Sequence, residues 1–178
     1  MIGLAIKLTG ALIIAAGGLM AGFKLKKNYS KRRSLLKAMQ DALKYADDAI
    51  AIENTLLDDV LIACGSKFFA GDNGEDVFTL SAGYLRNEFG SFERAWDKAC
   101  TEFYEKYACL KKEDTECISG IGKALGLANT QRQSAHIESA VKRLAALEQE
   151  AQTAETKEGK NAVKIALAIS AAVIIVLF

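Results

Sequence analysis

Both ends of the chain are apolar segments of about the length that crosses a membrane. Residues 1–23 contain one charged side chain, Lys7, and residues 8–23 contain none. As a helix, 23 residues reach about 34 Å, which exceeds a hydrocarbon core of about 30 Å. Residues 161–178 reach about 27 Å, and we expect their one charged side chain, Lys164, to extend toward a polar surface. The sequence therefore predicts transmembrane helices at residues 1–23 and 161–178.

Positive charge beside the two apolar segments predicts their orientation. Residues 24–37 contain seven Lys or Arg and no acid, and Lys157 and Lys160 precede the second segment. Because Lys and Arg beside a span favour the cytoplasmic side, we predict that residues 24–160 are cytoplasmic and that both termini lie outside, in a double-spanning cell-membrane protein. The alternative for the first segment is a cleaved signal peptide, with Lys7 as its charged region. The cations that follow the segment favour a retained anchor.

Charge also separates two parts of the cytoplasmic region. Residues 24–37 are a basic juxtamembrane segment, which we expect to be attracted to anionic lipid of the bilayer. Residues 38–160 contain 14 Lys or Arg and 22 Asp or Glu, a net charge of −8. This acidic helical domain disfavours nucleic acid as a partner, because both would be negatively charged. It favours a basic protein partner, with a merely solvated surface as the alternative.

The cysteines do not have the spacing of a metal or redox site. No two of Cys64, Cys100, Cys109 and Cys117 form a C-x-x-C pair, and the single histidine, His136, is far from all of them in sequence. Structural zinc sites use closely spaced pairs of ligands. We therefore interpret the four cysteines as small buried apolar residues of a reducing compartment.

Motifs of catalysis are missing from the sequence as well. Gly120-Ile121-Gly122-Lys123 is too short for a phosphate-binding loop and lies within a helical pattern. Acidic pairs occur at Asp47-Asp48, Asp58-Asp59 and Glu113-Asp114. Neighbouring acids on a helix diverge by about 100°, so we interpret them as solvated residues or as first-turn acids of helices. We predict no catalytic, cofactor-binding or metal-binding residue, no cofactor, and no enzymatic activity.

Apolar residues recur at helical spacing throughout the interior, and no segment alternates as a strand would. The chain contains no proline. The predicted fold is all-α: a cytoplasmic six-helix antiparallel bundle between an N-terminal and a C-terminal transmembrane helix. Gly159 is the expected weak point if the last helix runs on into the membrane. The predicted helices span 31–50, 54–69, 75–88, 92–109, 112–126 and 130 onward.

Single residues within this pattern carry further predictions. Trp96 is expected in the core, because large aromatic side chains dominate core burial. Ser91 is a candidate N-cap for the helix that begins at Phe92, and the glycine-rich run at 71–74 predicts a turn. Gly122 and Gly126 are expected to permit close packing or a turn.

Several short blocks of residues follow one another in an order that matches a known family. They are Lys7-Leu8-Thr9-Gly10-Ala11-Leu12, Leu36-x-x-Met39-x-x-Ala42-Leu43, Phe92-x-x-Ala95-Trp96, Glu113-Asp114-x-Glu116, Gly122-x-x-Leu125-Gly126, Gln133-x-x-x-Ile137, Leu144 and Ala151. In this order the sequence resembles the stage III sporulation protein AB family of endospore-forming bacteria. The resemblance covers almost the whole chain, and its most specific part is the block from Gly122 to Gln133.

The sequence departs from the family pattern at several positions. It has no proline, it has Thr55-Leu56-Leu57 and Asn129, and it has three alanines in the last segment, Ala166, Ala168 and Ala171. Those alanines leave open how tightly the last segment packs on another helix.

The resemblance implies a function. The family belongs to the apparatus that links mother cell and forespore, in the mother-cell membrane around the forespore, and is similar to the platform protein of type II secretion and type IV pilus machines. It implies a non-enzymatic platform with a cytoplasmic motor ATPase and other membrane components of the channel as partners. Self-association stays open. The alternatives are a platform of a general secretion or pilus machine, and an exported, tail-anchored binding protein whose cysteines would face an oxidising space.

Overall fold

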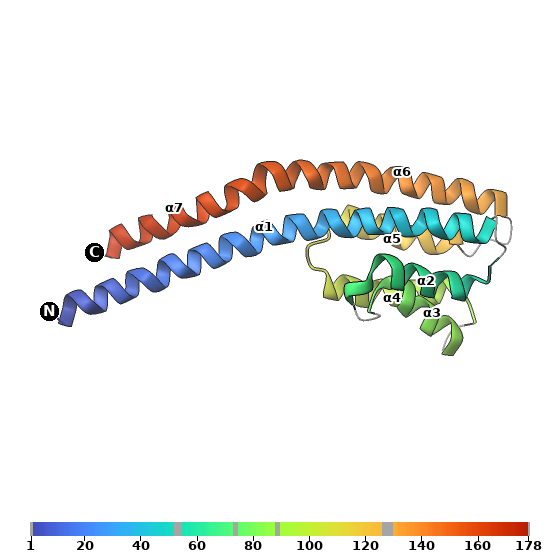
Figure 1. The fold of residues 1–178 in the computed structure, drawn as a ribbon, viewed down its shortest axis with the longest axis horizontal. Coiled ribbons are helices and arrows are strands. Elements are labelled where there is room, and N and C mark those ends of the chain that lie inside the picture. The colour runs from blue at the N-terminus through green and yellow to red at the C-terminus, as the bar shows by residue number, and fades with distance from the viewer. Residues whose placement is uncertain (1, 52–54, 73–74, 88–89, 126–129, 178) are drawn as a thin grey trace. The chain divides into compact units, whose positions relative to one another are not determined.

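The structure is a computed structural model, and it describes residues 2–51, 55–72, 75–87, 90–125 and 130–177. Every regular element in these residues is helical (Figure 1). The prediction of an all-α fold is therefore confirmed for the described residues. The elements are α1 (Ile2–Ala51), α2 (Leu57–Phe68), a 3₁₀ turn (Ala70–Asp72), α3 (Val77–Asn87), α4 (Phe92–Lys106), α5 (Lys112–Leu125), α6 (Thr130–Ala154), a π-helical turn (Glu155–Gly159) and α7 (Lys160–Leu177).

The chain forms two compact units. One, which we call the bundle unit, is Ser34–Glu148, and the other, the terminal unit, combines Met1–Arg33 with Gln149–Phe178. The bundle unit contains the C-terminal part of α1, the whole of α2 to α5 and most of α6. These are the six helices that the sequence predicts, and the starts of the last four lie within two residues of the predicted ones.

The core of the bundle unit consists of the predicted apolar stripes. Leu36, Met39 and Leu43 of α1 are fully buried, and so are Phe78 of α3 and Phe103 of α4. Within the unit, α3 packs on both α2 and α4, and α4 packs on α5. Burial of apolar side chains at about 25 cal/mol per Å² is the main contribution that holds such a bundle together.

Trp96 lies at the centre of this core, as predicted. It is fully buried, and its ring makes an edge contact with the ring of Phe78 at a centroid distance of 5.4 Å. Its indole Nε1–H donates a hydrogen bond of 3.0 Å to the carbonyl of Ile118 in α5. A buried Trp usually finds such a partner for its one polar group. This bond ties α4 to α5.

Gly122 permits the close approach of α5 to Trp96. A Cβ atom at position 122 would lie 2.6 Å from Cδ1 and 2.9 Å from Cγ of Trp96, closer than real Cβ contacts allow. The prediction that Gly122 serves close helix packing is confirmed, whereas Gly126 lies outside the described residues. Gly65 of α2 has a similar role, because a Cβ there would meet the side chains of Thr79 and Asp76.

Helix capping differs from the prediction at two positions. Ser91 is the N-cap of α4 and accepts a backbone bond from Ala95 N, but its side chain makes no capping hydrogen bond. Asp76, which the sequence analysis did not single out, caps α3 instead: its Oδ1 accepts bonds of 3.0 Å from the backbone N–H groups of Phe78 and Thr79. Asp76 is buried, so its carboxylate satisfies donors that would otherwise be orphaned.

The predicted turn at residues 71–74 is described only in part. Residues Ala70–Asp72 form the 3₁₀ turn, and positions 73 and 74 lie outside the described residues.

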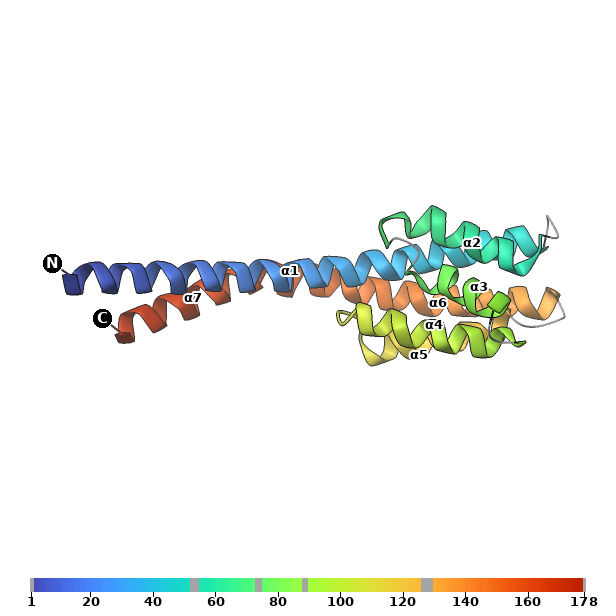
Figure 2. The same ribbon diagram turned by 90° about the horizontal axis from the view of Figure 1, so that it is seen from below.

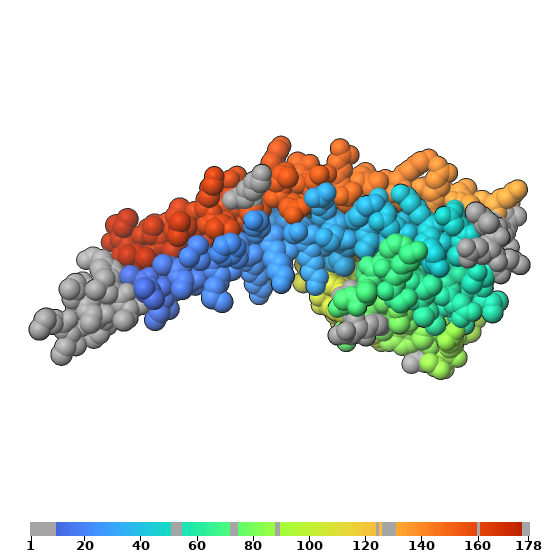
Figure 3. Space-filling view, in the orientation of Figure 1, coloured from blue at the N-terminus to red at the C-terminus, as the bar shows by residue number. Residues whose placement is uncertain are grey.

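In the terminal unit, the N-terminal part of α1 lies beside α7, as both ribbon views and the space-filling view show (Figures 1, 2 and 3). Gly18 and Gly22, one helical turn apart, bring the two backbones together. A Cβ at Gly22 would lie 2.9 Å from the Cα of Val163, and one at Gly18 would collide with the hydroxyl of Ser170. The alanines of the last segment therefore do not prevent tight packing, since the small residues that permit it lie in α1.

The last helix is interrupted near the predicted weak point. The π-helical turn Glu155–Gly159 separates α6 from α7. Gly159 is buried beside Tyr29 and Lys26 of α1. Across the parts of the chain that the structure describes, no helix has both the length and the apolar character of a membrane span. The two predicted transmembrane helices stay predictions.

Candidate docking surfaces

The described cysteines and acids do not assemble into a metal or nucleophile site. Among the described residues, no group of three or more His, Cys, Asp and Glu side chains could hold a metal ion. None of the four cysteines forms a disulfide, and Cys64, Cys100 and Cys117 are buried, as predicted, whereas Cys109 is half-buried. Burial raises the pKa of the Cys64 thiol to about 12 and that of Cys100 to about 12. These two side chains are neutral thiols near pH 7, and thiols are poor nucleophiles.

The interpretation of the acidic pairs as solvated or first-turn residues is confirmed for Asp58-Asp59 and Glu113-Asp114, which lie in the first turns of α2 and α5. Asp58 and Asp59, in the first turn of α2, both pair with Arg86 of α3 at the surface, at 2.7 and 3.3 Å. This guanidinium holds the pKa of Asp58 below its usual value. Asp47 accepts a hydrogen bond from Ser134 at 2.7 Å, which joins α1 to α6.

Asp114 departs furthest from the expectation of a solvated acid. It lies in the first turn of α5 but is fully buried, and it accepts a bond of 2.8 Å from the backbone N–H of Lys111. Its carboxylate therefore belongs to the packed start of the helix. The sequence signal that it shares with Asp76 is an acid at the very start of a helix, where backbone donors are unpaired.

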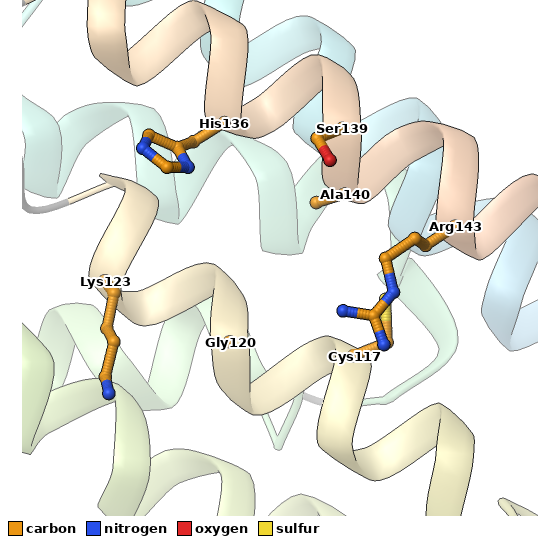
Figure 4. A pocket seen from close by; sticks show the side chains of 7 residues that line it. All are labelled: Cys117, Gly120, Lys123, His136, Ser139, Ala140 and Arg143. Carbon is orange, nitrogen blue, oxygen red and sulfur yellow. The ribbon is translucent and has the colours of Figure 1, made fainter.

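A groove of about 340 Å³ opens between α5 and α6 of the bundle unit (Figure 4). Figure 4 shows the guanidinium of Arg143 extending from α6 toward α5, with the ring of His136 and the hydroxyl of Ser139 on the same side of α6. None of the lining residues is acidic. The lining residues are Cys117, Gly120 and Lys123 from α5, and His136, Ser139, Ala140 and Arg143 from α6.

The groove is thus a basic feature in a domain of net negative charge. Lys123 is exposed, and in the described part of the chain its ion-pair partner is Glu93, at 4.0 Å. Among the described residues, Arg143 forms no ion pair, although Lys142 beside it pairs with Glu138 at 2.6 Å. This groove was not predicted from the sequence. Lys123 and Arg143 are 20 residues apart in the chain, and they line the same groove only because of how α5 and α6 are arranged.

The terminal unit exposes large apolar side chains. Leu12 is 74% exposed and Ile175 is 77% exposed, which is costly in water for so many neighbouring residues. A second cavity of about 600 Å³ lies between α1 and α7 and has mainly small and aliphatic residues in its wall, with Tyr29, Glu158 and Asn161 at one end. The other exposed apolar residues of these helices are Ile13, Met20, Phe23, Leu25, Ile165, Leu167, Ile169 and Val173.

Polar contacts join α1 to the C-terminal end of α6 and to the π-helical turn. Arg32 is only 3% exposed and pairs with Glu150 at 3.5 Å, and Arg33 pairs with Glu155 at 3.3 Å. A hydrogen bond from Tyr29 to Glu158 raises the pKa of the tyrosine. Lys37 of the same segment pairs with Asp41 at 2.7 Å, so at least three of the seven cations of the basic juxtamembrane segment have acidic partners within the chain. From the sequence we assigned all seven to the membrane surface. The pairs of Arg32 and Arg33 were missed because their acids are more than 100 residues away in sequence.

Comparisons with known proteins agree with this architecture. The profile of the family described as stage III sporulation protein AB matches residues 7–178. A curated relative named stage III sporulation protein AB, from Bacillus subtilis (strain 168), is 27% identical over 158 residues, which cover 87% of this chain and 89% of the relative. A solved structure of a stage III sporulation protein AB has the same fold with a TM-score of 0.63, at 21% identity, over 71% of this chain and 98% of that one. The chain belongs to the stage III sporulation protein AB family.

Proposed function

We propose that the chain is a sporulation protein that serves as a non-enzymatic membrane platform of a channel between mother cell and forespore. The observation that carries the proposal is the family match, which extends from residue 7 to residue 178 and so includes both units. The sporulation role is supported by the relative from Bacillus subtilis, which is named stage III sporulation protein AB. The helical bundle and the absence of catalytic motifs from the sequence agree with a binding role rather than an enzymatic one.

Membrane anchoring through the terminal unit is the second part of the proposal. Residues 8–23 contain no charge, and the large aliphatic side chains that α1 and α7 expose include Leu12, Ile13, Ile165 and Ile175. Such surface is stable in a bilayer and unfavourable in water. The Gly18 and Gly22 contacts with α7 are of the small-residue type that brings membrane helices together. The positive charge of segment 24–37 supports a cytoplasmic location for the bundle unit in this proposal.

The third part is docking of a cytoplasmic motor ATPase of the same apparatus by the bundle unit, with other membrane components of the channel bound through the terminal unit. Support comes from the family resemblance to platform proteins of secretion and pilus machines, and from the net charge of −8 on residues 38–160. An acidic surface accelerates encounter with a basic partner.

Co-purification tests the docking role. The full chain in a non-ionic detergent should retain the motor ATPase of the apparatus through a size-exclusion column, whereas a detergent-solubilised unrelated membrane protein should not. Repeated failure with protein whose circular dichroism shows the expected helix content would contradict the docking role. The family assignment and the fold would be unaffected.

Cysteine labelling tests the topology. Cys64 and Cys117 are buried and would report poorly, so a Lys112→Cys variant in a Cys109→Ser background is the better probe, since Lys112 is 84% exposed. A membrane-impermeant maleimide should label it only after the cells are permeabilised. A Phe178→Cys variant, at the predicted outer end, is the matched control and should be labelled in intact cells. Labelling of position 112 in intact cells would contradict the cytoplasmic placement and favour an exported protein.

A further inference from the structure

The groove between α5 and α6 has the chemistry of an anion-binding site. Three of its lining side chains, Lys123, His136 and Arg143, are basic types, and none is acidic. Ser139 adds a hydroxyl donor on the same side of α6 as Arg143 (Figure 4). A guanidinium presents parallel donors that match a carboxylate, so Arg143 can hold one in a bidentate pair. Among the described residues Arg143 forms no ion pair, so its guanidinium is available to pair with a carboxylate of a ligand.

Gly120 is a second and independent observation at the same place. It lies in the interior of α5, where glycine destabilises a helix relative to alanine. Gly122, two residues further on, is explained by its contact with Trp96, but a Cβ at Gly120 would meet nothing within 4 Å. No packing within the chain therefore requires glycine at this position. A bare backbone there leaves the floor of the groove open to a ligand that lies across α5.

The size of the groove and the charge of the surrounding domain restrict the kind of ligand that can bind in it. A space of about 340 Å³ holds a few side chains and not a folded domain. Residues 38–160 carry a net charge of −8, which repels a polyanion of high charge density such as nucleic acid. A short segment with a few carboxylates is attracted by the local cations and feels less of that repulsion. We propose that the groove between α5 and α6 binds an acidic peptide segment of a partner protein, whose carboxylates pair with Arg143, His136 and Lys123 and whose backbone lies over Gly120.

Carboxylate-to-lysine cross-linking tests the proposal at the residue level. The probe is an acetylated and amidated hexaglutamate peptide, which is first mixed with the full chain in a non-ionic detergent so that its carboxylates can bind, and a carbodiimide is added only then to join a bound carboxylate to a nearby lysine as an amide. Peptide mapping by mass spectrometry identifies the lysine that is joined. We expect a cross-link to Lys123, with weaker products on the lysines of the basic segment 24–37 serving as an internal reference.

Four variants separate binding in the groove from general charge effects. Arg143→Ala should lower the amount of cross-linked product at Lys123 on the order of tenfold, because a charge-assisted hydrogen bond is lost. Lys142→Ala removes the same charge from the neighbouring position and should leave the amount of that product unchanged. Gly120→Gln fills the groove and should abolish the product. Gly83→Gln is its control, because Gly83 lies in the interior of α3 and also has nothing within 4 Å of a built Cβ.

Three results would overturn the proposal. The first is a product confined to the lysines of segment 24–37. The second is equal loss in Arg143→Ala and Lys142→Ala while both variants keep the circular dichroism of the parent protein. The third is competition by inorganic phosphate at the same concentration as the peptide, which would assign the groove to a small anion. The proposal does not depend on the sporulation role, so co-purification with the ATPase can fail while the cross-link to Lys123 persists.

Discussion

Two glycines in the same helix should respond in opposite ways to the same substitution. Gly120 and Gly122 lie in the interior of α5, where replacing glycine by alanine favours the helix by about 1 kcal/mol. At position 120 nothing opposes that gain, because no atom lies within 4 Å of the added Cβ. At position 122 the added Cβ would lie 2.6 Å from Trp96 Cδ1 and 3.1 Å from its Cβ, so the indole must move.

The movement of Trp96 is costly because its position is fixed on several sides. Its Nε1–H donates to the carbonyl of Ile118, and its ring contacts Phe78 and Phe92. Overpacking of a core costs about 1–3 kcal/mol, and a weakened hydrogen bond adds about 1 kcal/mol. After subtraction of the helix gain, Gly122→Ala should destabilise the fold by about 1–3 kcal/mol, whereas Gly120→Ala should stabilise it by about 1 kcal/mol.

Thermal unfolding of the two variants in the same detergent measures the difference. Trp96 is the only tryptophan of the chain, so its fluorescence reports on the site, and far-UV circular dichroism reports on the helices. A difference of about 2–4 kcal/mol corresponds to unfolding midpoints separated by about 4–16 °C. Equal midpoints, or a more stable Gly122→Ala variant, would refute the packing of α5 against Trp96.

Three further predictions concern a cap, the thiols and the pairing of α1 with α7. Asp76→Ala should destabilise the bundle by about 1–2 kcal/mol, because two backbone donors of α3 lose their acceptor; an unfolding midpoint equal to that of the parent would contradict this. Cys64 and Cys100 should resist iodoacetamide at pH 8 until the protein unfolds. Because the pKa of each is raised from 9.0 to about 12, the folding stability that they contribute should be present below pH 9 and lost as the pH rises toward 12, which urea titrations across that range would detect. The double variant Gly18→Cys with Ser170→Cys should form an intramolecular disulfide under mild oxidation, visible as a mobility shift that a reductant reverses, since the two side chains would meet.

Helical periodicity was sufficient to predict the bundle because each helix has one buried stripe. The spacing of Phe92, Trp96, Ala99 and Phe103 places all four on one side of α4, and all four are buried. The start of α4 at Phe92 followed from Gly90-Ser91, yet the side chain of Ser91 makes no capping bond. Local sequence identifies where a helix can begin, but the geometry of the entering chain decides which side chain reaches the free donors.

The contacts between distant residues were not predictable from one sequence. Arg32 and Arg33 have the same local pattern as the lysines around them, and only the return of the chain at Glu150 and Glu155 distinguishes them. The basic groove likewise depends on the packing of α5 against α6. Asp114 was interpreted as a first-turn acid, which is correct for its place in the helix, but its burial depends on tertiary packing.

The count of heat-resistant spores in a strain that lacks this gene tests the central claim most directly. We expect that the deletion strain forms no heat-resistant spores and that its development stops after engulfment. A plasmid copy of the gene should restore the number of heat-resistant spores. Normal numbers of heat-resistant spores in the deletion strain would contradict the proposed role in the sporulation channel.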